Sequence, residues 1–304
     1  MNKKAFSLVL TLWIVAMIGL VSVLYLSYSK RVIEKSFQLY DKLEVRFQAE
    51  SVIELLNFYA STGNIRLNYI ENKSLKSILP TFPTKIQIDS KEFVWRNTKI
   101  SLQDTAGLIS IENIKMISHY TSEHILKLKD KKSIIANSIK DWLDKDDFLT
   151  ASGAENPFYK PYGYGARNKG YFAAIDELFL LRGMEDLSNL NKETLNSLIV
   201  ISSLTKRNIS TLPKSLLQSY YNLSKSDSEI LNNLKIAGKI QEFQSFFNLA
   251  HKENFSIEID GFHPSGVIKM NITSSKNEIK SIISLLVSFH PKNKQAFRIL
   301  NYKN

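Results

Sequence analysis

The chain contains no cysteine, and only 7 Pro and 11 Gly occur among its 304 residues. The absence of cysteine excludes a disulfide scaffold, a thiolate metal site and a cysteine nucleophile. The scarcity of Pro and Gly, together with 44% hydrophobic residues, excludes a collagen-like or disordered chain. The remaining class is a folded chain, long enough for about two domains.

Charged residues of both signs are also missing from one segment. Overall, 40 basic residues outnumber 29 acidic ones, for a formal net charge of +11, which suits nucleic acid, anionic lipid or solubility alone. Yet no charged residue occurs between Ala5 and Ser29. The apolar run Phe6–Leu26 is long enough to cross a hydrocarbon layer of ~30 Å, so it predicts a membrane-spanning helix.

A cleavable secretory signal is the alternative for this run. The apolar region of such a signal is usually about 7–15 residues long and is followed by small residues at the cleavage site. Here the run is longer, and Ser-Tyr-Ser at 27–29 makes a poor site. The sequence therefore favours a retained membrane anchor.

Periodicity predicts the elements that follow. Apolar residues spaced three and four apart continue one amphipathic helix to about Ala60. Alternating residues predict strands at 86–90, 92–104 and 107–113, and again at 255–260, 266–273, 282–289 and 296–300. Between them, residues 114–249 have mostly helical patterns, which include 124–128, 176–181 and 193–201.

The N-terminus has a specific layout. Met1-Asn-Lys-Lys-Ala5 ahead of Phe6 resembles the class III leader of the type IV pilin and pseudopilin superfamily. This resemblance implies that prepilin peptidase cleaves between Ala5 and Phe6 and that Phe6 becomes the methylated N-terminus. Two residues depart from the pattern: Ala5 replaces the usual Gly, and Leu10 stands where most pilins carry Glu.

Leu10 narrows the resemblance within the superfamily. A carboxylate in hydrocarbon is costly, so pilins pair that Glu with the N-terminal amine of a neighbouring subunit. A subunit with Leu10 cannot make this pair. In this respect the chain resembles the K-type minor pseudopilin of type II secretion, which is proposed to sit at the filament tip, where no earlier subunit offers an amine.

The middle of the chain strengthens this resemblance. The motifs that resemble the central signature of K-type pseudopilins are Ile139–Asp147, Gly153-Ala-Glu155, Tyr159, Tyr164, Asn168 and Asp176–Met184. Residues 104–113 are similar to the family's entry into its helical subdomain, and Asn208–Pro213 resembles its second helical repeat. The likeness spans nearly the full chain.

The resemblance implies an α+β fold, with a pilin-like long N-terminal helix, an antiparallel sheet and a large inserted all-α subdomain of helix-hairpin-helix or SAM-like type. The expected parts are a leader (1–5), a transmembrane helix and amphipathic stalk (6–60), an α+β head (61–113 and 250–304) and the helical subdomain (114–249). The subunit is expected in the inner membrane in a single pass, with its C-terminal head in the periplasm.

The implied function is that of a non-enzymatic assembly subunit. Its expected partners are the I-type and J-type minor pseudopilins, the major pseudopilin, prepilin peptidase and the inner membrane. The minor pseudopilins together would start the pseudopilus at its tip and support export of folded proteins across the outer membrane. The alternatives are a minor pilin of a type IV pilus, in adhesion or DNA uptake, and a membrane-anchored periplasmic hydrolase.

Five carboxylates stand close together in this otherwise basic chain: Asp141, Asp144, Asp146, Asp147 and Glu155. Such a cluster suits Ca²⁺, which takes six to eight oxygen ligands. Asp144 and Glu155 have the spacing of an EF-hand loop, but Phe148 and Leu149 stand where that loop needs an oxygen ligand and Gly. An irregular Ca²⁺ loop and a solvated acidic helix end both remain open from the residues alone.

K-type pseudopilins bind calcium, so the resemblance implies a structural Ca²⁺ ion here. The predicted ligands are Asp144, Asp146, Glu155 and Asn168, with Asp141, Asp147 and Glu177 in reserve.

Other chemistries are not supported. His119, Glu123 and His124 depart from the His-x-x-Glu-His zinc motif, and five positions of an α-helix put the two histidines about 140° apart. The helical repeats at 187–204 and 212–249 have no Gly-rich hairpin to grip phosphate, so no nucleic-acid partner is expected. The Gly163–Gly170 loop is expected to pack onto the helices through Tyr159, Tyr162, Tyr164 and Tyr171. No catalytic residue is predicted.

Overall fold

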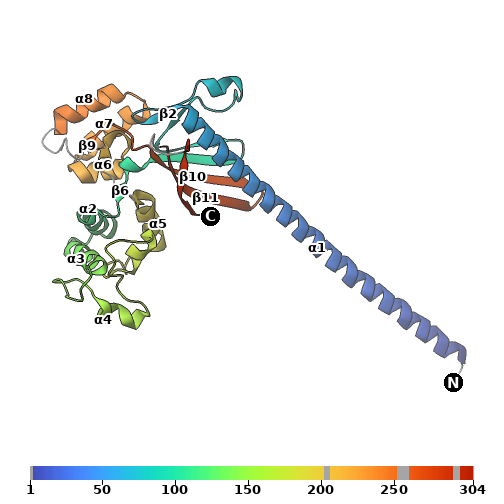
Figure 1. The fold of residues 1–304 in the computed structure, drawn as a ribbon. Coiled ribbons are helices and arrows are strands. Elements are labelled where there is room, and N and C mark those ends of the chain that lie inside the picture. The colour runs from blue at the N-terminus through green and yellow to red at the C-terminus, as the bar shows by residue number, and fades with distance from the viewer. Residues whose placement is uncertain (1–2, 202–205, 252–259, 290–294, 304) are drawn as a thin grey trace.

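A computed structural model describes residues 3–201, 206–251, 260–289 and 295–303. Helix α1 (Lys3–Thr62) is one unbroken helix of 60 residues, about 90 Å long. Figure 1 shows that it projects from the head as a rod, with the N-terminus at its free end. The helix ends just beyond the predicted limit of about Ala60, which confirms the long N-terminal helix.

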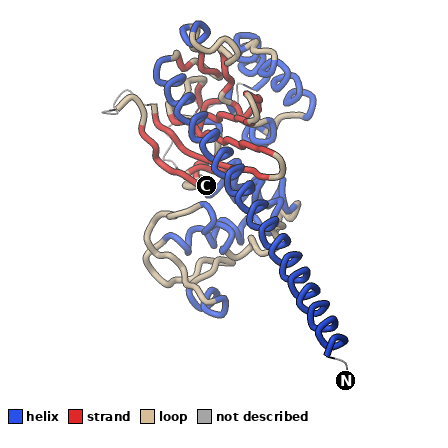
Figure 2. The backbone as a smooth tube through the Cα atoms, turned by 90° about the vertical axis from the view of Figure 1, so that its right-hand side faces the viewer, coloured by secondary structure: helices blue, strands red, loops and turns tan. Residues whose placement is uncertain are grey.

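The second half of α1 packs on an antiparallel sheet. The strands are β4 (Asp89–Trp95), β5 (Thr98–Asp104), β10 (Val267–Lys276), β11 (Ile279–Ser288) and β12 (Arg298–Lys303), in the order β12-β11-β10-β5-β4. In β10, alternate residues are buried, and the buried set packs with Val52 and Leu56 of α1. The pilin-like α+β fold predicted from the sequence is therefore confirmed, and Figure 2 shows α1 crossing the sheet.

A salt-bridged contact marks the point where α1 leaves the sheet. At the β10–β11 turn, the Lys276 Nζ atom lies 2.8 Å from Asp41 Oδ1 and 2.7 Å from Glu44 Oε2. Asn277 Nδ2 donates to Asp41 Oδ2 at 2.9 Å. Before this contact, the described side chains of α1 from position 10 to position 40 are almost all exposed.

Short strands and turns complete the head. A three-stranded sheet consists of β1 (Asn64–Ile65), β2 (Tyr69–Glu71) and β3 (Lys85–Gln87). Two parallel pairs join distant segments: β6 (Ile109–Ser110) with β7 (Ile199–Val200), and β8 (Arg207–Asn208) with β9 (Asp260–Gly261). Two 3₁₀ turns, at Ser74–Ser77 and Thr105–Gly107, link these strands.

Residues between β6 and β9 are mainly helical. The helices are α2 (Ile114–His119), a π-helix (Tyr120–Leu126), α3 (Lys131–Leu143), α4 (Asn156–Tyr159), α5 (Asn189–Leu198), α6 (Lys214–Tyr221), α7 (Lys225–Ile236) and α8 (Ile240–His251). Short 3₁₀ turns lie at Lys160–Tyr162, Ile175–Leu180 and Ile209–Thr211. These helices share a hydrophobic cluster of their own, around Trp142, Tyr159 and Phe243, separate from the cluster beneath α1.

Two helix predictions differ from the structure, and one strand prediction is largely untested. The helix expected over 193–201 ends at Leu198, because Ile199 and Val200 pair with β6 instead. The expected helix over 176–181 is a 3₁₀ turn. The strand predicted at 255–260 lies outside the described residues except for Asp260.

A buried carboxylate joins the sheet to the helices. Asp104, at the end of β5, accepts hydrogen bonds from Asn208 Nδ2 (2.9 Å), the Ser265 hydroxyl (2.6 Å) and the Ser265 N–H (3.0 Å). The following turn passes very close to the helical region, because a Cβ added at Gly107 would lie 2.5 Å from the Thr211 carbonyl oxygen. The chain therefore enters and leaves the helical region at one fixed junction.

Candidate metal centre

Helix α3 carries the first two carboxylates of the candidate site. Asp141 lies in its last turn and is fully buried, and Asp144 is its C-cap, whose N–H donates to the Lys140 carbonyl at 2.9 Å. Residues three apart share one face of a helix, so both carboxylates point the same way. The sequence ends the helix here because turn-forming residues follow.

The loop after α3 folds back onto it. The Thr150 N–H donates to Asp141 Oδ2 at 3.2 Å, and the Gly153 N–H donates to the Thr150 carbonyl at 2.8 Å. This return brings Glu155, which precedes α4, beside the two aspartates. One carboxylate oxygen from each of Asp141, Asp144 and Glu155 then lies within 4.8 Å of the others.

The facing oxygens are buried and unpaired. Asp141 Oδ1, Asp144 Oδ1 and both oxygens of Glu155 accept no hydrogen bond from the described residues. Glu155 is only 3% exposed. Three converging carboxylates with unpaired oxygens repel one another and lose hydration, so the arrangement is costly unless a cation or protons neutralise it.

The carboxyl pKa values reflect this cost. Burial, and then the charges of Asp144, Asp141 and Asp147, raise the pKa of Glu155 to about 7. Burial, and then Asp146, Asp141 and Asp147, raise the pKa of Asp144. A divalent cation held by these oxygens would offset both the lost hydration and the repulsion, and hard oxygen donors fit Ca²⁺.

The structure brings only some of the predicted ligands close together. It brings together Asp144 and Glu155 with Asp141, which the sequence had placed in reserve. Asn168 is adjacent along the fold: its N–H donates to the Trp142 carbonyl at 3.0 Å, and its Oδ1 is buried without a partner. The end of α3 thus holds this loop next to the acidic group.

The other three candidates lie outside the group. Asp146 Oδ1 accepts from the Phe148 N–H at 2.9 Å, and Asp147 Oδ1 accepts from Asn156 at 3.0 Å. Glu177 accepts from Arg167 at 2.7 Å and from Trp142 Nε1 at 3.4 Å. Asp141 lies three residues before Asp144 on a predicted helix. This spacing could have identified Asp141, rather than Asp146, as the partner of Asp144.

The histidine pair corrects an assumption about helix geometry. His119 and His124 have ring centroids 5.7 Å apart, although α-helical geometry separates them. The reason is the π-helix, in which residues five apart are bonded and lie one above the other. His119 Nδ1 lies 2.8 Å from Glu123 Oε1 and 3.2 Å from Lys132 Nζ.

The tyrosines of the adjacent loop divide between core and surface. Tyr159 is fully buried against the Trp142 ring, with centroids 5.0 Å apart, and Tyr164 is half-buried. Tyr162 and Tyr171 are exposed. The packing expectation is therefore confirmed for the first two rings. At the surface, the Tyr162 ring still contacts Phe158, with centroids 5.8 Å apart, and Tyr171 lies beneath the Arg167 guanidinium at 5.0 Å.

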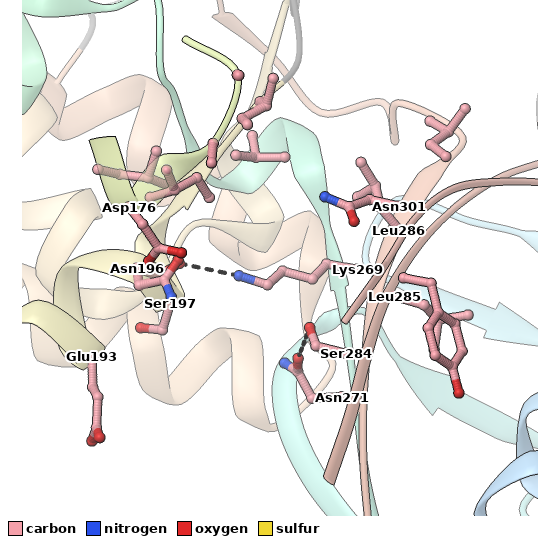
Figure 3. Close-up of a pocket in the computed structure, with 18 residues that line it drawn as sticks. Asp176, Glu193, Asn196, Ser197, Lys269, Asn271, Ser284, Leu285, Leu286 and Asn301 are labelled. Atoms are coloured by element: carbon pink, nitrogen blue, oxygen red, sulfur yellow. Dashed lines mark hydrogen bonds between the residues drawn. The ribbon is translucent and has the colours of Figure 1, made fainter. Parts of the chain in front are cut away.

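A separate cleft of 880 Å³ lies between α5, β7 and the outer face of the sheet. Figure 3 shows Lys269 reaching from the sheet toward α5, where its Nζ donates to the Asn196 carbonyl at 3.2 Å. Across the floor, the Ser284 hydroxyl donates to Asn271 Oδ1 at 2.7 Å. The Lys269 bond ties the helical region to the sheet, and the Ser284 bond joins β11 to β10 within it.

One helix in the described part of the chain is long and apolar enough to cross a membrane, judged by length and composition. It is α1, whose apolar window has a mean hydropathy of 2.2 and is 0% buried. This agrees with a membrane anchor near the N-terminus.

Comparison with known proteins supports the fold. No family model matches the chain, and no protein of curated function matches its sequence. The fold is similar to a chain in the crystal structure of the GspK-GspI-GspJ complex of the type 2 secretion system from enterotoxigenic Escherichia coli, with a TM-score of 0.52 and 15% sequence identity. The match covers 88% of this chain and 98% of that one, and it shows a shared pseudopilin-like fold.

Proposed function

We propose that the chain is a K-type minor pseudopilin, a non-enzymatic subunit that helps to start the pseudopilus of a type II secretion system at its tip. The observation that carries this proposal is the fold likeness over 88% of the chain, helical region included. The absence of an acidic side chain at Leu10 supports the tip position, because a tip subunit has no earlier neighbour to neutralise one.

The first part of the proposal concerns anchoring and processing. The leader 1–5 is removed between Ala5 and Phe6, Phe6 is methylated, and residues 6–60 form the anchor and stalk. The uncharged helix segment supports a single pass through the inner membrane, with the head of residues 61–113 and 250–304 and the helical subdomain 114–249 in the periplasm.

The second part concerns partners. The similar chain was crystallised in a complex of GspK, GspI and GspJ, so we propose I-type and J-type minor pseudopilins as partners, followed by the major pseudopilin. The exposed stalk supports this. Phe37, Tyr40 and Phe47 are each more than 60% exposed on a helix that the β10–β11 turn of the head contacts at Asp41 and Glu44. Apolar side chains on such a helix can pack against the helices of neighbouring subunits.

The third part concerns the ion. Asp141, Asp144 and Glu155, with Asn168, would hold Ca²⁺, and the ion would neutralise the group and fix the loop between α3 and α4. Its role is structural, since the ligands join two segments of one helical region.

Mass spectrometry of the N-terminus tests the proposal. Prepilin peptidase should leave a membrane-extracted protein that starts at methylated Phe6. Retention of Met1, or cleavage near Ser29, would refute the pseudopilin mechanism. Co-expression with the I-type and J-type subunits tests the partners, and the three should purify as one complex from detergent.

A further inference from the structure

Two sequence motifs that lie 29 residues apart meet at one hydrogen bond. Arg182 Nη1 donates to the Gly153 carbonyl oxygen at 2.8 Å. The guanidinium also lies over the Phe158 ring, 5.3 Å from its centroid. Arg182 is half-buried, so two separate contacts hold its side chain against the loop that leads to Glu155.

Gly153 is required by a close approach. A Cβ atom built on this residue would collide with Asp141 Oδ2 and would lie 2.8 Å from Asp141 Cγ. Gly153 does not have a positive φ, so the space it leaves, and not its backbone conformation, is what the fold uses. The loop can lie against Asp141 only because residue 153 has no side chain.

This arrangement places Glu155, the third carboxylate, beside the two aspartates. The Gly153 N–H donates a hydrogen bond to the Thr150 carbonyl, and the Thr150 N–H donates one to Asp141. Glu155 lies two residues after Gly153. Because the Gly153 carbonyl is engaged by Arg182, the loop is held from both sides. A carboxylate oxygen of Glu155 then lies within 4.8 Å of one from Asp141 and one from Asp144, and all three residues keep buried, unpaired oxygens for a cation.

We propose that Gly153 and Arg182 are positioning residues of the ion site. Gly153 lets the loop close onto Asp141, and Arg182 holds it closed, so that Glu155 meets Asp141 and Asp144. This inference rests on the calcium site proposed above. Neither residue contacts the ion.

Because Arg182 is positively charged, the direction in which its removal changes calcium affinity tests the proposal. If Arg182 acted only as a nearby positive charge, its removal would tighten the binding of a divalent cation. If it positions the loop, its removal weakens binding. Residues that orient metal ligands typically contribute about 10–100-fold to affinity.

The experiment is calcium titration calorimetry on the full chain in detergent. Arg182→Ala and Gly153→Ala should each weaken calcium binding at least ~10-fold, and Arg182→Lys should recover part of the loss. Gly261→Ala is the matched control, because its added Cβ meets nothing closer than 3.9 Å. Near-UV circular dichroism checks the fold, and Arg182→Gln replaces Arg182→Ala if the latter does not fold.

The outcomes separate the two proposals. Unchanged or tighter calcium binding in the Arg182 variant, or unchanged binding in Gly153→Ala, overturns the positioning roles. No calcium heat from the unaltered protein overturns the ion site itself. Weakening in both variants, with normal binding in Gly261→Ala, supports the inference.

Discussion

At the scale of single residues, the proposed ion site makes the sharpest prediction. Asp141→Asn and Glu155→Gln remove a converging charge each, so both should abolish the rise in melting temperature that the proposed calcium site predicts for the unaltered protein. An ion at 100 times its Kd stabilises a fold by about 2.7 kcal/mol, which thermal melting with calcium or a chelator detects. Asp146→Asn is the control, because Asp146 lies outside the converging group. If it weakens the calcium effect equally, the ligand set is the one expected from the sequence.

Asp104 makes a second prediction at this scale. Burial raises the pKa of its carboxyl group, and the bonds from Ser265 and Asn208 oppose that rise. Asp104→Asn keeps the shape but puts an amide donor where the surrounding groups also donate. We expect the free energy of unfolding to fall by about 2–3 kcal/mol, measured by denaturant titration. Asp130→Asn, at an exposed helix start, should change it by less than about 0.5 kcal/mol. Equal effects would show that the Asp104 bonds contribute nothing specific.

At the scale of elements, a buried ion pair joins α7 to β4. Lys235 Nζ donates to the Leu212 carbonyl at 2.9 Å and lies 3.7 Å from Asp89 Oδ2. Removing one partner of a buried pair leaves an uncompensated charge, so Lys235→Met should cost about 3–5 kcal/mol of unfolding free energy. The double variant Lys235→Met with Asp89→Asn should recover most of that loss. Lys225→Met, exposed on the same helix, is the control, and failure of the double variant to recover would contradict the pairing.

The same lysine predicts a pH dependence. Burial lowers the pKa of Lys235 below its ordinary 10.5, and Asp89 opposes the shift. The unfolded chain therefore keeps this proton to a higher pH than the folded chain does. It follows that the contribution of Lys235 to the unfolding free energy increases as pH rises toward 10.5. Denaturant titrations at alkaline pH should show a smaller increase in Lys235→Met than in the unaltered protein. A steeper increase in the variant would show that the pKa is raised instead.

Periodicity predicted elements better than it predicted contacts. The long helix and the strands of the main sheet follow from spacing alone. The π-helix does not, because one extra residue in a turn leaves the apolar pattern intact yet brings His119 and His124 together. Ile199 and Val200 continue a helical pattern, but they pair as a strand with β6, which lies 90 residues earlier. In both cases a local signal was overridden by tertiary contacts.

The ion site shows the same limit. Composition located the acidic cluster, but it could not rank Asp141 above Asp146, because that choice depends on the path of the loop between α3 and α4. The path depends in turn on Gly153 lying against Asp141 and on Arg182, far along the chain. Only the folded structure shows these two contacts.

At the scale of the whole molecule, the proposed tip position predicts the effect of a charge in the membrane. Leu10 lies on the apolar part of α1 and is 52% exposed among the residues that the structure describes. Leu10→Glu places a carboxylate in hydrocarbon, where it needs a cationic partner. A subunit inside the filament would find the N-terminal amine of an earlier neighbour, but a tip subunit has none.

We therefore expect Leu10→Glu to reduce pseudopilus formation and protein export, measured by filament yield and by secreted protein in the medium. Leu10→Ile keeps the position apolar and should leave both unchanged. Prepilin processing at Ala5–Phe6, followed by mass spectrometry, shows whether each variant enters the membrane correctly. Normal export with a fully processed Leu10→Glu subunit would mean that an earlier neighbour supplies an amine, and the subunit would then belong within the filament and not at its tip.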